Sequence, residues 1–234
     1  MGVGVRDPDY RRVHTFVSGP PRCGTNWLTY IVQTLLPDKK VRHCHTMRDR
    51  MRAKSMMLIL RNPKEACLRH VGSGTGKGID HKIDVNKIPE DKRESFMGEH
   101  KKRNDKRIES IFENNFAGEP NVNDYLYPII FFDSFSGQKM LIYYEDLITN
   151  PKKVISGIAE HLGTSAEDFL NKYEWHKEES IKGYENKNFK SVTRGNKVSF
   201  HSDHFPENIL KRFEGIINKQ PENVKKYIAQ YTGG

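Results

Sequence analysis

Short apolar runs alternate with segments of helical periodicity along this chain. Residues 13–19, 56–60 and 139–144 are mainly apolar runs of strand length. The segments 25–36 and 151–163 instead repeat apolar residues every three or four positions, which is typical of a helix with one buried face. Strands that alternate with helices in this order predict an α/β fold of three layers, in which helices flank a central parallel sheet.

Proline and glycine mark where several of the predicted helices begin and end. Pro37 ends the first helix, and Pro63 suits the first turn of a helix that runs through about His70. Pro151 opens a later helix, and Gly163 caps it. Further helices are expected from near residue 106 unevenly to 135, at 166–173 and at 207–217.

Within a predicted insertion at 72–125, the segment 72–107 differs in composition from the rest of the chain. It holds four glycines between Gly72 and Gly78 and a dense mixture of charged residues, with few large apolar side chains. Such a composition favours a loop or lid over packed elements. We expect this segment to be an insertion in a single domain that spans residues 1–234, a length that suits one domain.

The composition restricts the partners and the location that we expect for this protein. Lysine and arginine outnumber aspartate and glutamate by 39 to 30, which gives a formal net charge of +9 and favours anionic partners. The apolar runs fall short of the ~20 residues that a membrane-spanning helix needs, and the first residues lack the apolar core of a secretory signal. The three cysteines form no CxxC pair, which indicates reduced thiols. We therefore expect a cytoplasmic protein without a membrane span.

The strongest local signal is the loop of residues 18–27, which joins the first strand to the first helix. A loop that enters a helix presents unpaired N–H groups and the positive end of the helix dipole to an anion. Gly24 allows the backbone to approach a phosphate closely, and Arg22 adds a planar fork of donors. A plain turn with a helix cap is the simpler alternative. A Walker A loop would need a lysine after its last glycine, where this chain has Thr25.

A second signal follows the strand 56–60. Arg61 leaves the end of this buried strand, and ligands of parallel sheets bind at the carboxyl ends of the strands. Arg69 lies eight residues further along the chain. A structural ion pair is the alternative for a lone arginine. We expect Arg22 and Arg61 to face one crevice from two separate turns.

Together these two signals resemble motifs of the sulfotransferases that use 3'-phosphoadenosine 5'-phosphosulfate (PAPS), in particular those of the cytosolic type. The phosphosulfate loop of that family has the form Pro-Lys/Arg-Ser-Gly-Thr-x-Trp, which residues 21–27 match with Cys23 in place of serine. The 3'-phosphate element of the family, Arg-Asn-Pro-Lys-Asp, is similar to residues 61–65. A Tyr-Glu-Asp element with a later Asn-Pro and Leu-Gly resembles residues 144–163, and a fourth element resembles residues 193–195 in part. The chain is short for this family.

The resemblance implies a P-loop-like phosphosulfate loop and one site for PAPS and its product, 3'-phosphoadenosine 5'-phosphate (PAP). The residues implied to hold the 5'-phosphosulfate are Arg22, Cys23, Gly24, Thr25 and Asn26. Those implied to lie near the adenine are Trp27, Tyr144 and Trp175. Core packing is the alternative for the last two. Those implied to bind the 3'-phosphate are Arg61, Arg69, which stands where the family usually has serine, Arg194 and Gly195.

The resemblance also implies a catalytic base. Cytosolic members carry Lys-x-His between the two phosphate elements, so His45 aligns with the base and His43 takes the lysine position beside the acceptor. An imidazole can accept the proton of a hydroxyl or amine near neutral pH during in-line sulfuryl transfer. Arg22 would act with it by stabilising the charge that builds on the leaving phosphate. The two histidines could also bind a metal, but further ligands at useful spacing do not follow, so we expect no metal.

Two other functions stay open from the sequence. A P-loop-like nucleotide or small-molecule kinase would use the same loop, although the Walker lysine is missing. A non-catalytic nucleic-acid-binding protein would use the positive charge, with Lys92, Arg93 and residues 100–103 as its footprint. Acidic residues alternate with these and no aromatics interleave, so we expect no nucleic-acid partner. The expected acceptor is a small molecule, a glycan or a lipid, and the oligomeric state stays open.

Overall fold

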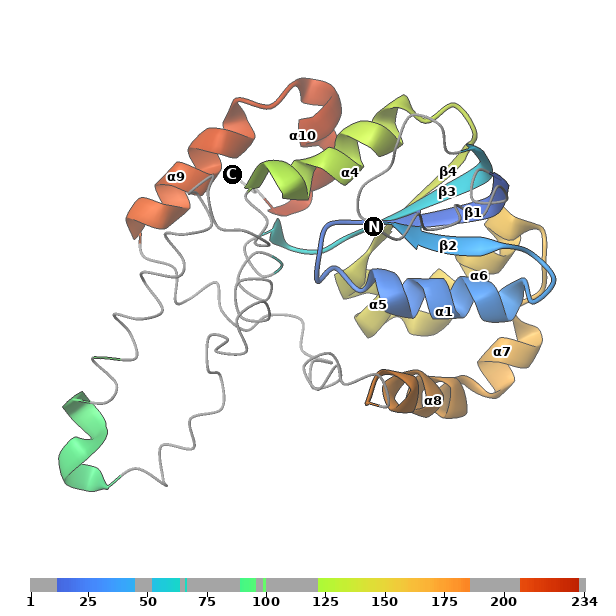
Figure 1. The fold of residues 1–234 in the computed structure, drawn as a ribbon, viewed down its shortest axis with the longest axis horizontal. Coiled ribbons are helices and arrows are strands. Elements are labelled where there is room, and N and C mark those ends of the chain that lie inside the picture. The colour runs from blue at the N-terminus through green and yellow to red at the C-terminus, as the bar shows by residue number, and fades with distance from the viewer. Residues whose placement is uncertain are drawn as a thin grey trace, which may run out of the picture. The chain divides into compact units, whose positions relative to one another are not determined.

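The computed structural model describes residues 12–44, 52–63, 66, 89–95, 99, 122–185 and 207–231. Figure 1 shows the helices and strands that they form. The chain divides into two compact units. The first comprises residues 1–61 and 127–198, and the second comprises residues 62–126 and 199–234.

The first unit is built around a parallel sheet of four strands in the order β2-β1-β3-β4. Its strands are β1 (Arg12–Ser18), β2 (Val41–Cys44), β3 (Arg52–Leu60) and β4 (Gln138–Tyr143). Each neighbouring pair of strands runs in the same direction. The strands therefore all end at one edge of the sheet, and the predicted α/β fold with a central parallel sheet is confirmed.

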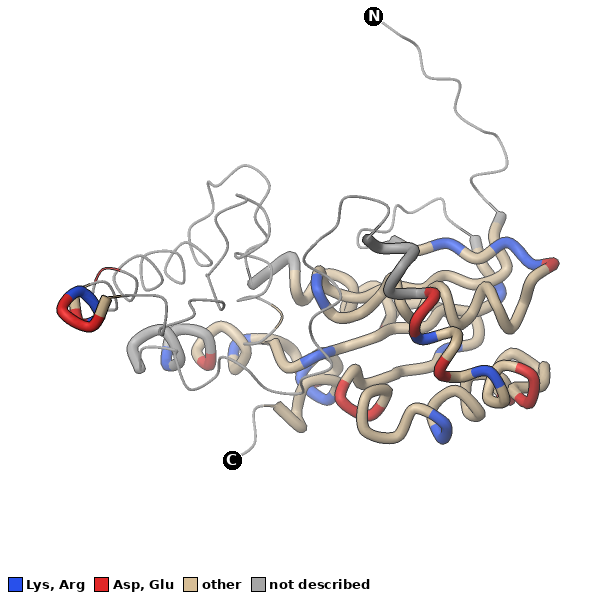
Figure 2. The backbone as a smooth tube through the Cα atoms, turned by 90° about the horizontal axis from the view of Figure 1, so that it is seen from below, with Lys and Arg blue, Asp and Glu red and all other residues tan. Residues whose placement is uncertain are grey.

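The central strands are buried on both faces, which explains their continuous apolar sequences. Phe16 and Val17 of β1 and the five residues from Met56 to Leu60 of β3 have no exposed surface. In a parallel sheet, helices cover both faces, so consecutive residues of a strand can all be apolar. Figure 2 shows the charged residues on the helices and near the strand ends instead.

Helices flank the sheet on both faces. They include α1 (Thr25–Leu35), α4 (Val122–Ser134), α5 (Tyr144–Thr149) and α6 (Pro151–Leu162). Two more helices, α7 (Glu167–Asn171) and α8 (Tyr173–Glu185), follow α6 along the chain. Figure 1 shows α1, α5 and α6 against one face, and residues 127–134 of α4 against the other. Leu28, Ile31 and Val32 of α1 are fully buried, as their helical spacing predicts.

The helix α6 begins and ends at the residues that the sequence predicts. Pro151 occupies the first turn, where its missing N–H removes no helical hydrogen bond. Gly163 adopts a left-handed φ of 68°, and the Thr164 N–H donates to the Ala159 carbonyl at 2.9 Å. The Gly163 N–H donates in turn to the Glu160 carbonyl at 3.0 Å. Such paired bonds satisfy the last carbonyls of a helix, so this turn closes α6 where the sequence places its end.

The structure differs from the predicted elements at several places: β2 is a strand that the sequence does not predict, and β3 begins at Arg52 rather than at residue 56. Tyr144 opens the short helix α5, although the sequence extends the strand through it. The predicted helix 166–173 ends at Asn171, and α8 begins directly afterwards at Tyr173. The periodicity does not predict α8, because its sequence is rich in lysine and glutamate and lacks an apolar stripe.

The second unit includes elements near the end of the described chain. They are α9 (Glu207–Asn218), α10 (Glu222–Ile228) and the 3-10 helix η4 (Ala229–Tyr231). Of the predicted insertion at 72–125, residues 90–95 are helical and α4 begins at Val122, while most of the rest lies outside the described residues. A single domain over the whole chain stays a prediction. Among the helices described, none has the length and apolar character to cross a membrane.

Two buried serines of the sheet differ in their surroundings. Ser55 of β3 lies with its Oγ 3.0 Å from Nε2 of His161 on α6, and burial lowers the pKa of that imidazole. Ser18, at the end of β1, is fully buried, and its Oγ has no hydrogen-bond partner in the described part of the chain. A buried hydroxyl without a partner is destabilising, whereas a bonded one is not.

We expect Ser18→Ala to raise the free energy of unfolding by about 1 kcal/mol, because it removes a buried hydroxyl that lacks a partner. Ser55→Ala is the matched control, since it removes a bonded hydroxyl from the neighbouring strand and should lower the stability by about 1 kcal/mol. Urea unfolding followed by circular dichroism measures both changes. An equal loss of stability in the two variants would contradict the account of Ser18.

Candidate functional site

Three of the predicted site segments leave the sheet at the same edge. The loop of residues 19–24 follows β1, Arg61 follows β3 and Tyr144 follows β4. The register places Ser18 beside Leu58 and Leu60 beside Tyr143, so the three strands end within two residues of one another. All three segments belong to the first unit. The carboxyl ends of parallel strands therefore bring them together, as expected for a ligand site in this fold.

The loop after β1 has a backbone that few side chains would permit. A Cβ atom on Gly19 would overlap the Ile59 carbonyl oxygen, so the end of β3 excludes any side chain there. Gly24 caps α1 with a φ of 90°. Arg22 adopts a φ of 67°, which is rare for a residue with a side chain and stores about 1 kcal/mol or more of strain. Strain of this kind concentrates at binding sites, which agrees with an anion loop.

The start of α1 suits a negatively charged ligand. Gly24 has no side chain to cap the helix, and the first turn, Thr25 to Trp27, contains no acidic residue. The positive end of the helix dipole is therefore not offset by carboxylates of its own first turn. Thr25 and Cys23 are buried, Trp27 is half-buried and Asn26 is exposed.

Arg61 and Tyr144 form the central contact of the site. The guanidinium carbon of Arg61 lies 4.3 Å from the centre of the Tyr144 ring, which is the geometry of a cation–π interaction. Both side chains are buried, with 2% of Arg61 and 8% of Tyr144 exposed. A charge buried to this degree interacts more strongly with a nearby anion than one in water does.

The same ring also touches the loop after β1. A Cβ atom on Gly24 would lie 2.8 Å from Cδ2 and 3.1 Å from Cε2 of Tyr144. The ring is thus in contact with the backbone of the loop as well as with Arg61. The structure brings together Gly24, Tyr144 and Arg61. That Arg22 and Arg61 face one crevice stays a prediction.

Several predicted residues fall outside the described residues. They are His45, Arg69, Arg194 and Gly195. The described chain reaches Cys44 at the end of β2, where His43 is exposed and pairs in register with Val17 of β1. Within the described ranges, no group of three or more His, Cys, Asp or Glu side chains is arranged to hold a metal ion.

Trp175 lies on α8 in a cluster of rings that the sequence does not predict. Its exposed fraction is 55%, and its ring meets the edge of His176 with centroids 4.9 Å apart. His176 is buried, stacks on Phe169 at 4.2 Å, and places its Nδ1 3.0 Å from the hydroxyl of Tyr30 on α1. Burial and then the charge of Lys172 lower the pKa of His176.

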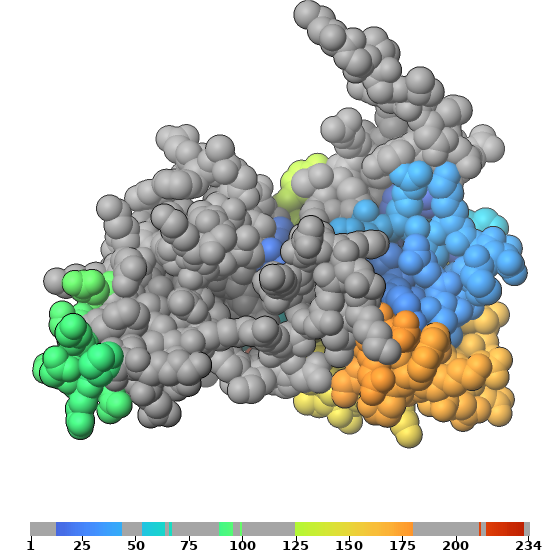
Figure 3. Space-filling model, turned by 60° about the horizontal axis from the view of Figure 1, so that its bottom comes forward, coloured from blue at the N-terminus to red at the C-terminus, as the bar shows by residue number. Residues whose placement is uncertain are grey.

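This ring cluster joins α8 to α1. Figure 3 shows the surface of α8, in orange, beside that of α1, in blue. Tyr30 lies three residues after Trp27, so the two side chains share a side of α1. The cluster therefore links Trp175, through His176, to the side of α1 that carries Trp27, which is another predicted adenine contact. A lone histidine within a charged helix gives no sequence signal that could have revealed this contact.

We expect Gly24→Ala to destabilise the protein by two separable effects. The left-handed backbone accounts for about 1 kcal/mol. The clash with the Tyr144 ring adds about 1–3 kcal/mol, because the ring is buried and packed against Arg61 and so cannot easily move away. Gly163→Ala is the matched control, since Gly163 has a φ of 68° and a Cβ atom there would meet no other atom within 4 Å. Unfolding in urea measures both variants, and equal losses would contradict the ring contact.

Comparison with known proteins supports the fold. No protein-family model matches the chain, and no curated protein sequence matches it. A crystal structure of mouse sulfotransferase SULT7A1 complexed with PAP superposes with a TM-score of 0.63, over 94% of this chain and 89% of that chain. The two sequences are 13% identical over this match. At that identity the likeness shows a shared α/β fold, in which helices flank a central parallel sheet.

Proposed function

We propose that this protein is a PAPS-dependent sulfotransferase, which transfers a sulfuryl group to an acceptor hydroxyl or amine. The observation that carries the proposal is the contact of one ring, Tyr144, with both Gly24 and Arg61. These residues come from the three motifs that resemble the family, and they meet at the edge of the sheet where the fold binds ligands. The fold shared with a PAP-bound sulfotransferase supports the same assignment.

The 5'-phosphosulfate would lie in the loop after β1. Its ligands in this proposal are Arg22, Cys23, Gly24, Thr25 and Asn26. Two observations support them: the left-handed backbone that turns the loop into α1, and the first helical turn without acidic residues. Backbone N–H groups at such a helix start are already oriented toward an anion. They therefore stabilise the negative charge that develops on the leaving phosphate in the transition state.

The 3'-phosphate would be bound by arginines at the other end of the nucleotide. Arg61 is the one whose position is described, and its buried guanidinium offers donors in a rigid fork. Arg69, Arg194 and Gly195 are proposed beside it. The adenine would lie among Trp27, Tyr144 and Trp175, and the ring cluster of α8 with α1 supports the placement of the last of these.

Catalysis in this proposal needs a base and a stabilised leaving group. PAPS supplies the sulfuryl group. His45 accepts the proton of the acceptor, and His43 lies on the acceptor side. Arg22 and the N–H groups of the loop stabilise the charge on the leaving phosphate oxygen. Positioning accounts for most of the remaining rate, as in phosphoryl transfer, and this scheme requires no metal. The proposed acceptor is a small molecule, a glycan or a lipid, and the proposed location is the cytoplasm.

We expect PAP to bind the protein and Arg61→Met to weaken that binding by about 10- to 100-fold, because charge-assisted hydrogen bonds contribute about 1.5–3 kcal/mol. Binding of adenosine 5'-phosphate, which lacks the 3'-phosphate, should change by less than about threefold. Isothermal calorimetry measures both.

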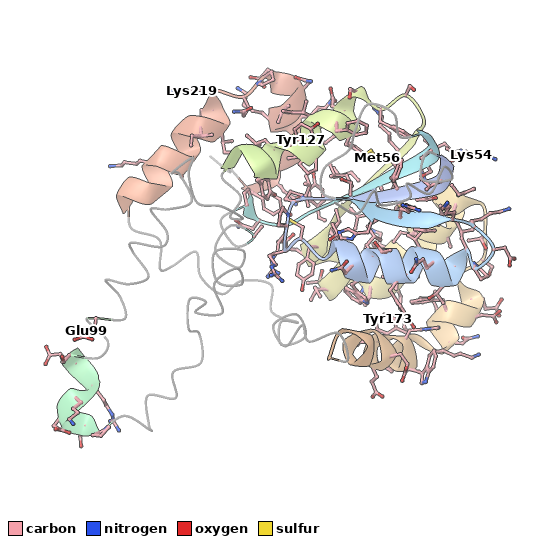
Figure 4. The ribbon with its side chains drawn as sticks, in the orientation of Figure 1. Lys54, Met56, Glu99, Tyr127, Tyr173 and Lys219 are labelled. Atoms are coloured by element: carbon pink, nitrogen blue, oxygen red, sulfur yellow. The ribbon has the colours of Figure 1, made fainter. Side chains whose placement is uncertain are left out.

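Lys54→Met is the matched control for Arg61→Met. It removes the same charge from the opposite end of the same strand, where Lys54 is exposed (Figure 4). It should leave both nucleotides unaffected. Equal losses for PAP and adenosine 5'-phosphate in Arg61→Met would contradict the 3'-phosphate role. Magnesium-dependent binding of ATP without binding of PAP would favour a kinase instead.

We expect His45→Asn to reduce sulfuryl transfer by about 10²- to 10⁴-fold, the usual contribution of a general base. The affinity for PAP should stay within about threefold, because the base contacts the acceptor. Transfer of labelled sulfuryl from PAPS to a panel of phenols, alcohols and amines gives the readout. His43→Asn is the control, and it should reduce sulfuryl transfer less than His45→Asn does. Unchanged turnover in His45→Asn would reject His45 as the base.

A further inference from the structure

We propose that Tyr144 is a positioning residue that couples the two phosphate-binding ends of the site. This inference rests on the proposed function and goes beyond a contact with adenine. The face of the ring holds the Arg61 guanidinium, and the Cδ2–Cε2 side of the ring supports the backbone at Gly24. One rigid side chain thereby contacts both Arg61, proposed for the 3'-phosphate, and the loop at Gly24, proposed for the 5'-phosphosulfate.

The contact with Arg61 restricts where the guanidinium can point. The guanidinium carbon lies 4.3 Å from the ring centre, well inside the range in which a cation is attracted to an aromatic face. Arg61 is 2% exposed and Tyr144 is 8% exposed, so water screens this attraction little. An arginine held in this way loses less conformational freedom when it binds a phosphate, which favours binding.

The contact with Gly24 supports the loop that precedes α1. A Cβ atom on Gly24 would lie 2.8 Å from Cδ2 of Tyr144 and 3.5 Å from Cδ1 of Ile59, so these two side chains form a wall behind the loop. Gly24 is the last residue before α1 and has a φ of 90°. A wall at this residue keeps the first N–H groups of the helix in one place.

Tyr144 is itself held by regular structure. It directly follows β4, whose last residue, Tyr143, pairs in register with Leu60 of β3. Tyr144 also opens α5, which packs against α6. A side chain between a strand of the sheet and a packed helix can transmit a constraint that a loop side chain cannot.

The coupling makes a distinct prediction for each chemical part of the tyrosine. The ring supplies both contacts, so Tyr144→Phe should bind PAP within about threefold of the unchanged protein. Tyr144→Leu removes the aromatic face and should weaken PAP binding by about tenfold. Adenosine 3'-phosphate and adenosine 5'-phosphate should both bind more weakly to this variant, because the ring serves both ends.

Calorimetry on the full chain tests the inference with these three nucleotides. Tyr143→Leu is the matched control, since it makes the same change at the neighbouring position and should leave the affinities unchanged. The losses of PAP affinity caused by Tyr144→Leu and by Arg61→Met should be less than additive in the double variant, because Tyr144 acts through Arg61. Additive losses of PAP affinity would overturn the coupling. A loss in Tyr144→Phe equal to that in Tyr144→Leu would also overturn it, because it would assign the effect to the hydroxyl and not to the ring.

A second series keeps the test valid if Tyr144→Leu does not fold. Phenylalanine with increasing numbers of fluorine atoms at position 144 weakens the negative face of the ring and leaves its shape nearly unchanged. PAP affinity should fall stepwise along this series, and a flat series would overturn the inference. The unchanged protein separates the two proposals: no PAP binding there rejects the proposed function, whereas PAP binding with a flat series rejects only the role of Tyr144.

Discussion

The burial of the Arg61 guanidinium is the constraint on which the rest of this site depends. A charge removed from water is unfavourable unless its surroundings compensate for it. Part of the compensation is the face of Tyr144, 4.3 Å away, and the ring is in turn packed against Gly24. The ends of β3 and β4 fix both partners, since their register places Leu60 beside Tyr143. The sheet thus supplies the rigidity, and two side chains give its edge a charged group that is largely shielded from water.

The loop after β1 shows how the fold maintains an unfavourable backbone. Gly19 lies against the Ile59 carbonyl, and Arg22 holds a left-handed conformation between a buried strand and a helix with one buried face. Such a conformation persists only where the surrounding packing fixes it. Here the packing comes from both ends of the loop, because Val17 and Leu28 have no exposed surface. The result is a helix start that is free of acidic side chains.

The fold and the chemistry rest on different observations. The likeness to a PAP-bound sulfotransferase at 13% identity concerns the arrangement of the sheet and helices, and one fold can host many activities. The assignment of a reaction therefore depends on particular residues, above all Gly24, Tyr144 and Arg61. The ring cluster around His176 adds a separate link, since its contact with Tyr30 holds α8, and with it Trp175, against α1.

The sequence alone predicted three of the four strands described here and the helices α1 and α6, because burial on two faces and on one face leave different apolar periods. It also marked the loop after β1 and Arg61 as candidate anion-binding positions, since glycine and arginine at strand ends are local signals. It did not reveal β2 or α8, whose residues carry no clear period, nor the link from His176 to Tyr30. Only the tertiary structure decided that Tyr144 lies between Gly24 and Arg61, because that contact depends on the pairing of β3 with β4. Contacts between residues far apart along the chain are set by packing, which a local pattern does not contain.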